Sequence, residues 1–234
     1  MVRVVAFDVD GTLVDLLPAL RGGLEAALGE LRRLTPAAEA LTIAHLQDDC
    51  VHAEAWLPPG SPVTEIRRAG FERTLKRVDL DRSALEAVCE AFFDRRFSLM
   101  RLFDDVRPVL AALRPSYVLG VGSNGNSDTA RCGLSGEFAF EVYAHVGGVP
   151  AKPHPEFFTR LAAAAGVEPD EIVYVGDSLD QDVVPAKAAG MRAVWVDRAG
   201  TGPVPGYEPD AIVRSLTFLP VVLAHLDDAV TRSA

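Results

Sequence analysis

A short apolar run that ends in a pair of acidic residues constrains the fold more than any other feature of this chain. Residues 2–7 are rich in β-branched side chains, which predicts a buried strand. Asp8 and Asp10 follow, and in extended chain two such carboxylates point the same way. Gly11 then permits a sharp turn, with the Thr12 hydroxyl at its mouth. Because adjacent carboxylates repel unless a cation or proton joins them, the pattern indicates a divalent metal and a nucleophilic carboxylate, with a solvated acidic turn as the alternative.

The composition is that of a globular protein with an acidic surface. Hydrophobic residues make up 49% and charged residues 24% of the 234, which is enough to bury a normal core. The net charge of -10 argues against a general binder of nucleic acid or of anionic membranes, because such binders need a basic surface. It leaves room for a local basic pocket that binds a small phosphorylated molecule.

Cysteine spacing and hydropathy bear on the cellular location. Cys50, Cys89 and Cys132 are far apart and form no CxxC pair, so we expect free thiols rather than a zinc site or disulfides. The first apolar stretch is too short for a signal peptide, and no window reaches the ~18 apolar residues of a membrane helix. We therefore expect a cytoplasmic protein with no membrane partner.

Residues 16–105 carry helical patterns throughout, with no convincing strand. The apolar spacing predicts helices over 16–34, 35–55, 64–78 and 83–99, with a Pro-rich loop at 56–62. The third of these helices is basic. Its cations either form a solvated face balanced by nearby acids or include one or two that reach a substrate anion.

From residue 106 onward, helices and strands alternate. The predicted helices cover 106–113, 127–134, 155–165, 183–189 and 219–230, and the predicted strands cover 117–122, 142–146, 172–175 and 193–196. This order favours an α/β fold with a parallel sheet and right-handed crossovers. We expect a core of residues 1–15 and 106–234, with an all-helical domain of residues 16–105 inserted after the first strand.

Polar residues follow the predicted strands at points where a parallel sheet would bring them together. These residues are Asp8 with Asp10, Ser123 with Asn124, Lys152 in its loop, and Asp177 with Asp182. The carboxyl ends of parallel strands share one edge of a sheet, which is where open α/β folds bind ligands. The set therefore predicts one site assembled from four segments.

Each residue of this set suits a step of phosphoryl transfer. We predict that Asp8 is the nucleophile that forms an aspartyl-phosphate, and that Asp10 is the general acid and base. Asp177, Asp8 and the Asp10 carbonyl would hold Mg²⁺, and Asp182 would orient Lys152 or a metal-bound water from outside the first ring of ligands. The predicted substrate-binding residues are Thr12, Ser123, Asn124 and Lys152, of which Ser123 and Lys152 would bind phosphate oxygens.

Four ordered motifs resemble those of the haloacid dehalogenase superfamily, which consists mostly of phosphatases. The motifs are Asp8-Val9-Asp10-Gly11-Thr12, Gly122-Ser123-Asn124-Gly125, Lys152-Pro153 and Val175-Gly176-Asp177-Ser178 with Asp182. The resemblance implies a Rossmann-like core with a mobile helical cap inserted after the first motif, similar to phosphoglycolate phosphatase and β-phosphoglucomutase. One departure is the loop at residues 147–151, which is about one residue longer than usual before Lys152.

We predict a Mg²⁺-dependent phosphatase that acts on a small phosphorylated metabolite, as a monomer or homodimer. A β-phosphoglucomutase-like phosphomutase shares all four motifs and stays an alternative. A dehalogenase is disfavoured by Asp10 and Asp177, since the founding dehalogenases lack the second carboxylate and need no metal. A phosphonate-cleaving enzyme would need a Schiff-base lysine in the cap, where Lys76 is the sole lysine. A binding protein of low turnover is the remaining alternative.

Overall fold

The structure is a computed structural model that describes residues 1–233, with side chains up to residue 227. The chain divides into two compact units, one formed by residues up to Val14 and from Leu102 onward, and the other by Asp15–Arg101. The second boundary therefore lies four residues before the predicted one at 105. Residues 102 and 103 belong to the first unit because Leu102 forms a bridge with Val14 and the Phe103 N–H donates to the Leu13 carbonyl.

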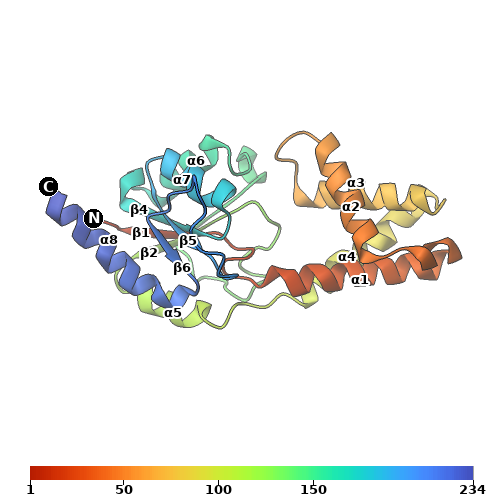
Figure 1. Ribbon diagram of the computed structural model, residues 1–234, viewed down its shortest axis with the longest axis horizontal. Coiled ribbons are helices and arrows are strands. Elements are labelled where there is room, and N and C mark those ends of the chain that lie inside the picture. Colours follow the sequence, from red (N-terminus) through yellow and green to blue (C-terminus); the bar gives the residue numbers. More distant parts are fainter. Residues whose placement is uncertain (234) are drawn as a thin grey trace. The chain divides into compact units, whose positions relative to one another are not determined.

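The first unit is built on a six-stranded parallel sheet, which confirms the predicted α/β fold (Figure 1). The strand order is β3-β2-β1-β4-β5-β6. The strands are β1 Val4–Phe7, β2 Val118–Ser123, β3 Phe140–Tyr143, β4 Ile172–Gly176, β5 Arg192–Val196 and β6 Ala211–Val213. Phe7 pairs with Val121 on one side and with Val175 on the other. The ends of β1, β2 and β4 are thereby aligned, and they carry three of the four predicted motifs.

Helices cover both faces of this sheet. Figure 1 shows α6 and α7 on one face and α5 and α8 on the other. Their bounds are α5 Val106–Leu113, α6 Pro155–Ala165, α7 Val184–Ala188 and α8 Leu219–Ser233. Because both faces are covered, every residue of β1 and β4 is buried, which is why these strands are apolar without alternation. On the α6 face, the rings of Phe157, Phe158 and Tyr174 pack edge to face at 5.4 Å.

The second unit is all-helical, as expected. Its helices are α1 Leu16–Leu34, α2 Ile43–Trp56, α3 Val63–Arg77 and α4 Leu85–Ser98. Helix α1 packs on α4, and α2 packs on α3. Their buried faces share a core in which the Phe71 and Phe92 rings meet edge to face at 5.3 Å.

Three predicted elements differ from the structure. The expected helix over 35–55 is a 3₁₀ turn at Pro36–Ala40 followed by α2, because Thr42 is extended and caps α2 through reciprocal bonds with His45. The expected strand at 142–146 is β3 instead, which ends at Tyr143 before His145 turns the chain with φ of +68°. Strand β6 was not predicted, since three residues carry little periodicity.

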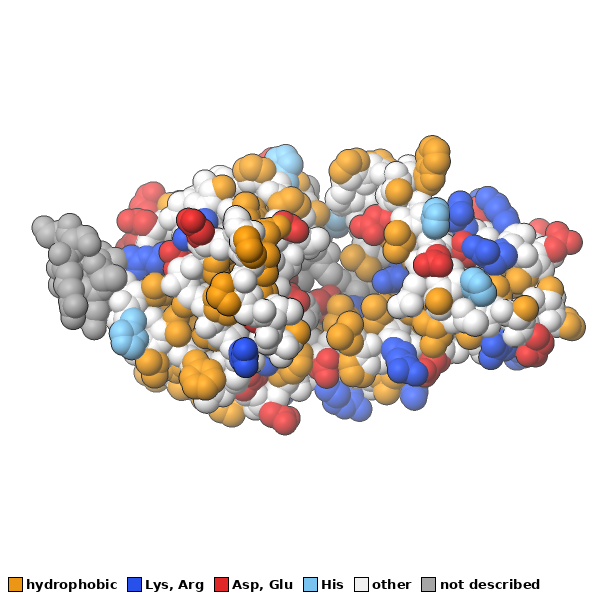
Figure 2. Space-filling view, viewed as in Figure 1, with side chains coloured by type: hydrophobic (Ala, Val, Ile, Leu, Met, Phe, Trp, Pro, Cys, Tyr) orange, Lys and Arg blue, Asp and Glu red, His pale blue; other side chains and the backbone are white. Residues whose placement is uncertain are grey.

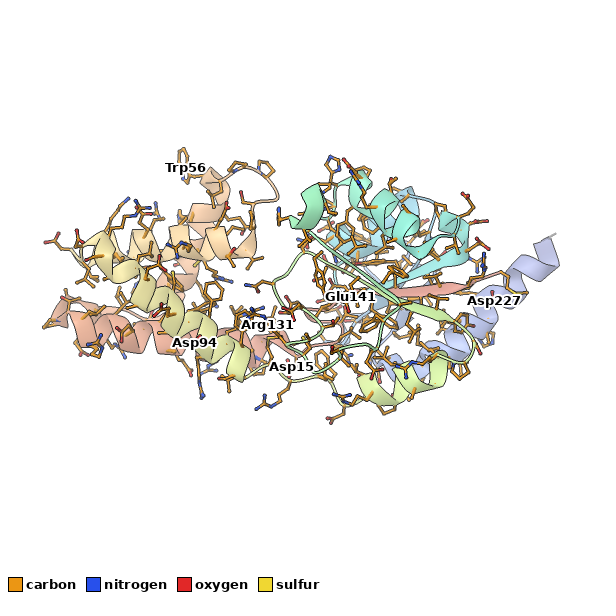
Figure 3. All side chains as sticks on the ribbon, turned by 180° about the vertical axis from the view of Figure 1, so that it is seen from behind. Asp15, Trp56, Asp94, Arg131, Glu141 and Asp227 are labelled. Atoms are coloured by element: carbon orange, nitrogen blue, oxygen red, sulfur yellow. The ribbon has the colours of Figure 1, made fainter. Side chains whose placement is uncertain are left out.

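The third predicted element that differs from the structure is the helix expected over 127–134, where the chain forms turns instead. The Thr129 N–H donates to the Tyr143 hydroxyl at 3.0 Å, and its own hydroxyl donates to Glu141 at 2.7 Å. Figure 3 shows Glu141 on β3 and Arg131 on the loop that follows β2. The loop keeps local turn bonds, such as the Cys132 N–H to the Asp128 carbonyl at 3.2 Å, but the bonds from Thr129 to β3 hold it outside a regular helix.

Among the described residues, no helix combines the length and the apolar character that crossing a membrane requires.

Candidate active site

The turn after β1 brings the first carboxylate to the end of the central strands. The Asp8 N–H donates to the Val175 carbonyl at 2.9 Å, and the Asp8 side chain is 9% exposed. Gly11 has φ of +88°, and a Cβ there would overlap the Asp177 carboxylate. Glycine is thus required at this position both by the backbone conformation and by the close approach of the β4 loop.

Lys152 lies between two carboxylates in the interior of the site. Its Nζ is 2.7 Å from Asp8 Oδ1 and 2.6 Å from Asp182 Oδ1, and all three side chains are less than a tenth exposed. Burial alone would lower the pKa of Lys152, but the charges of Asp182 and Asp8 raise it well above its usual value. The ammonium therefore stays charged. Burial raises the pKa of Asp8, and the Lys152 charge opposes that rise.

Asn124 holds the backbone of Lys152 through two reciprocal hydrogen bonds. Its Nδ2 donates to the Lys152 carbonyl at 2.8 Å, and its Oδ1 accepts the Lys152 N–H at 2.7 Å. The end of β2 thereby sets the position of a residue 28 positions further along the chain. Both polar atoms of the Asn124 side chain, which was predicted to bind substrate, are therefore engaged by the Lys152 backbone.

Ser123 and Asp10 lie around Gly125 on the β2 loop. The buried Ser123 hydroxyl accepts the Gly125 N–H at 3.1 Å. A Cβ at Gly125 would overlap the Asp10 carboxylate and would lie 3.6 Å from Ser123 Oγ. The predicted acid and base is therefore close to the predicted phosphate-binding serine.

Thr12 is held differently from the other predicted substrate-binding residues. Its side chain is fully buried, and its hydroxyl has no hydrogen-bond partner among the residues that the structure describes. Its carbonyl accepts a bond from Arg198 at 2.7 Å, and Arg198 also forms a bidentate pair with Asp105 and lies 3.6 Å from the Phe103 ring centroid. Direct contact between the Thr12 hydroxyl and a substrate stays a prediction.

Three carboxylates of this site are close enough to share a cation. Ligand oxygens of Asp8, Asp177 and Asp182 all lie within 4.8 Å of one another. Both Asp182 oxygens already accept bonds, Oδ1 from Lys152 and Oδ2 from the Ser178 N–H at 3.0 Å. Asp8 and Asp177 are therefore the better placed pair for a metal.

Asp177 shows the electrostatic strain that a cation would relieve. Asp177 is exposed to solvent, and the Trp195 indole N–H donates to its carbonyl at 2.9 Å. Desolvation by the surrounding protein and the charge of Asp182 raise its pKa to about 6. Carboxylate oxygens are the ligands that Mg²⁺ prefers, so this donor set fits the predicted ion.

Two residues of the site were missed from the sequence. The Tyr174 hydroxyl lies 3.0 Å from Lys152 Nζ, and Trp195 holds the Asp177 carbonyl. Both lie within buried strands, where an aromatic residue is ordinarily read as core. The one sequence signal for such residues was that each carries a polar atom, which needs a hydrogen-bond partner when the strand is buried on both faces.

The basic residues of α3 have their partners within the second unit. Arg68 pairs with Glu86, Arg73 and Arg77 approach Asp49, Lys76 lies 3.7 Å from Glu72, and Arg67 lies 5.6 Å from the Phe92 ring centroid. Figure 2 shows acidic and basic side chains interspersed over the surface of this unit. The arrangement is that of a balanced solvated face.

The chain is a member of the haloacid dehalogenase-like hydrolases, whose family model matches residues 2–190. It is 29% identical to N-acylneuraminate-9-phosphatase of Mus musculus over 99% of this chain and 98% of the relative. It is 31% identical to glyceraldehyde 3-phosphate phosphatase of Methanopyrus kandleri over 85% of each chain. These relatives support the predicted enzyme class, a phosphatase.

A solved structure of 2-haloacid dehalogenase from Pseudomonas syringae pv. Tomato DC3000 is also similar. It superposes with a TM-score of 0.80 at 31% identity and covers 96% of this chain and 99% of that one. The fold is thus shared by proteins named for two different reactions, so the choice between them depends on the residues of the site.

Proposed function

We propose that this protein is a Mg²⁺-dependent phosphatase that hydrolyses a small phosphorylated metabolite through an aspartyl-phosphate on Asp8. The observation that carries the proposal is the buried contact of 2.7 Å between Lys152 Nζ and Asp8 Oδ1, with Asp177 near enough to share a cation. A buried nucleophile that faces a cation on each side can accept a dianionic phosphate group without prohibitive repulsion.

The reaction has two steps. An Asp8 oxygen attacks phosphorus and forms a P–O bond, while the bond from phosphorus to the leaving oxygen breaks and Asp10 gives that oxygen a proton. Asp10, now a carboxylate, then takes a proton from water, whose oxygen attacks the phosphorus of the intermediate. Phosphate leaves, and Asp8 is regenerated as a carboxylate.

The remaining residues supply charge and position. Ser123 and Lys152 would bind phosphate oxygens, and Asn124 and Asp182 would keep Lys152 in place. Mg²⁺ would be held by Asp8, Asp177 and the Asp10 carbonyl, and when bound it offsets negative charge between these groups and the phosphate. Asp182 would act from outside this set of ligands, because its oxygens are engaged by Lys152 and Ser178.

Dehalogenation is the second candidate, because a similar solved structure bears that name. A halide needs no proton when it leaves, so a dehalogenase has no use for a second carboxylate beside the nucleophile. Asp10 and the acidic cluster around Asp177 are therefore unexplained in a dehalogenase and explained in a phosphatase. We also propose a cytoplasmic location, which the free thiols of Cys50, Cys89 and Cys132 support.

Phosphate release from a panel of phosphorylated compounds tests the proposal. The panel comprises N-acylneuraminate 9-phosphate, glyceraldehyde 3-phosphate, phosphoglycolate, nucleoside monophosphates and β-glucose 1-phosphate, each with Mg²⁺ and with EDTA. Release that needs metal and is lost in Asp8→Asn is the expected result. Isomerisation of the sugar phosphate without release would replace the phosphatase with a mutase. Chloride release from 2-chloropropionate in EDTA, with no phosphate release, would replace it with a dehalogenase.

A further inference from the structure

A tyrosine hydroxyl lies inside the site beside the lysine. Tyr174 is in the middle of β4 and is fully buried. Its hydroxyl is 3.0 Å from Lys152 Nζ and donates to the Gly122 carbonyl at 2.6 Å. The ring packs edge to face against Phe158, with centroids 5.4 Å apart.

The three shortest contacts of Lys152 match its three donors. An ammonium group has three N–H donors and no acceptor. Its three shortest contacts are Asp8 Oδ1 at 2.7 Å, Asp182 Oδ1 at 2.6 Å and the Tyr174 hydroxyl at 3.0 Å. The Gly122 carbonyl is further away at 3.4 Å. Among these three partners, the tyrosine hydroxyl alone can accept a hydrogen bond from the ammonium and at the same time donate one to the Gly122 carbonyl.

One of these contacts is with a group that the proposed reaction changes. Asp8 loses its negative charge when it becomes an acyl phosphate, and its hold on the ammonium weakens. Asp182 and Tyr174 are then the contacts that keep Lys152 in place. Because Gly122 precedes Ser123, the tyrosine also links the lysine to the strand end that carries the other phosphate-binding side chain.

We propose that Tyr174 is a positioning residue for Lys152, whose hydroxyl accepts the third ammonium proton and ties the lysine to the end of β2. The catalytic part of this proposal rests on the phosphatase function proposed above. A hydroxyl with this role affects the chemical step more than the binding of substrate, because Lys152 itself is still present when Tyr174 is changed.

Tyr174→Phe tests the proposal, since it keeps the ring and removes one oxygen atom. We expect kcat to fall about tenfold, as for the loss of one charge-assisted hydrogen bond, with KM within about twofold of wild type. The matched control is Tyr117→Phe, which also removes a tyrosine hydroxyl from the same unit but one that lies 3.4 Å from Asp227. The control is expected to keep the wild-type kcat.

A second readout does not depend on activity. Lysine ammonium groups that are buried and hydrogen-bonded give observable ¹⁵N-correlated NMR signals, and Lys152→Met identifies the signal of Lys152. Tyr174→Phe is expected to shift this signal and to speed its exchange with water, whereas Tyr117→Phe leaves it unchanged. In the wild-type protein, the ammonium protons should show a nuclear Overhauser effect to a slowly exchanging Tyr174 hydroxyl proton. This measurement tests the contact even if the phenylalanine variant does not fold.

The outcomes separate the two proposals. An unchanged ammonium signal in Tyr174→Phe, or kcat within twofold of wild type, would overturn the role of Tyr174. A wild-type protein that releases no phosphate from any compound would overturn the proposed function, while the NMR comparison would still decide whether the hydroxyl positions the lysine. Equal losses of kcat in Tyr174→Phe and Tyr117→Phe would reduce Tyr174 to a packing residue.

Discussion

Replacing Lys152 with methionine should destabilise the core far more than the loss of an ordinary ion pair. The substitution keeps an unbranched apolar chain one atom shorter and removes the charge that lies 2.7 Å from Asp8 and 2.6 Å from Asp182. Two carboxylates would then be buried without their cation. Removing one partner of a buried pair costs about 3–5 kcal/mol. Since each kcal/mol shifts Tm by about 2–4 °C in a chain of this size, the expected fall is about 6–20 °C.

The loss should depend on pH in a defined direction. Burial already raises the pKa of Asp8 above its unfolded value of 3.8, and the Lys152 charge opposes that rise. Without Lys152 the folded pKa of Asp8 rises further, so the folded variant holds a proton on Asp8 at pH values where both the folded wild type and the unfolded chain have released it. A group of this kind destabilises the fold as the pH rises from its unfolded pKa through its folded pKa. The deficit of the variant is therefore larger at pH 8 than at pH 5.5.

The chain offers a matched control in Lys187→Met. Lys187 Nζ lies 2.9 Å from Asp210 Oδ1, but these side chains are 35% and 27% exposed. A pair of this kind contributes about 0–1 kcal/mol, so the control should lose no more than about 4 °C. Calorimetry in EDTA at both pH values makes the comparison. Equal losses for the two variants would refute the view that Lys152 holds two buried carboxylates together.

Three further predictions follow from single residues. Because the folded pKa of Asp177 is about 6 against 3.8 unfolded, the metal-free protein should lose stability as pH rises through this range, and Asp177→Asn should lose less. Calorimetry in EDTA at pH 5 and 7.5 checks this difference, and adding Mg²⁺ at pH 7.5 should raise Tm in wild type but not in the variant. Gly125→Ala displaces the Asp10 carboxylate, so kcat should fall by about 10² while circular dichroism stays unchanged. Gly29→Ala, in α1 where no described residue lies within 4 Å of a new Cβ, should stabilise the protein by about 0.5–1 kcal/mol in urea titrations and leave kcat unaltered. A loss of stability would contradict the open surface at that position.

The parts of this protein that are predictable from sequence are those in which the local residue pattern has a single usual structural cause. Val4–Phe7 is apolar throughout because the strand is buried on both faces, and Asp8 follows at the strand end. Parallel topology then brings Lys152 and Asp182 to Asp8, although 144 positions separate the lysine from the nucleophile.

Elements that depend on distant partners were not predictable in the same way. Thr129 bonds to Glu141 and Tyr143, so the loop around it follows β3 instead of its own helical propensity. The Tyr174 hydroxyl has no local signature, because its partners Lys152 and Gly122 come from other segments. In both cases a local pattern is overridden by a hydrogen bond whose partner is remote in the sequence.

The double hydrogen bond between Asn124 and the backbone of Lys152 has a consequence for how this chain tolerates insertions. Because the end of β2 fixes Lys152, the length of the preceding segment does not set where the ammonium lies. Gly147 and Gly148 in that segment have open space around them, which suits a stretch of chain whose length can vary. A change of length in this segment is thereby absorbed before it reaches the lysine, and the segment is the natural place to insert a peptide tag without disturbing the site.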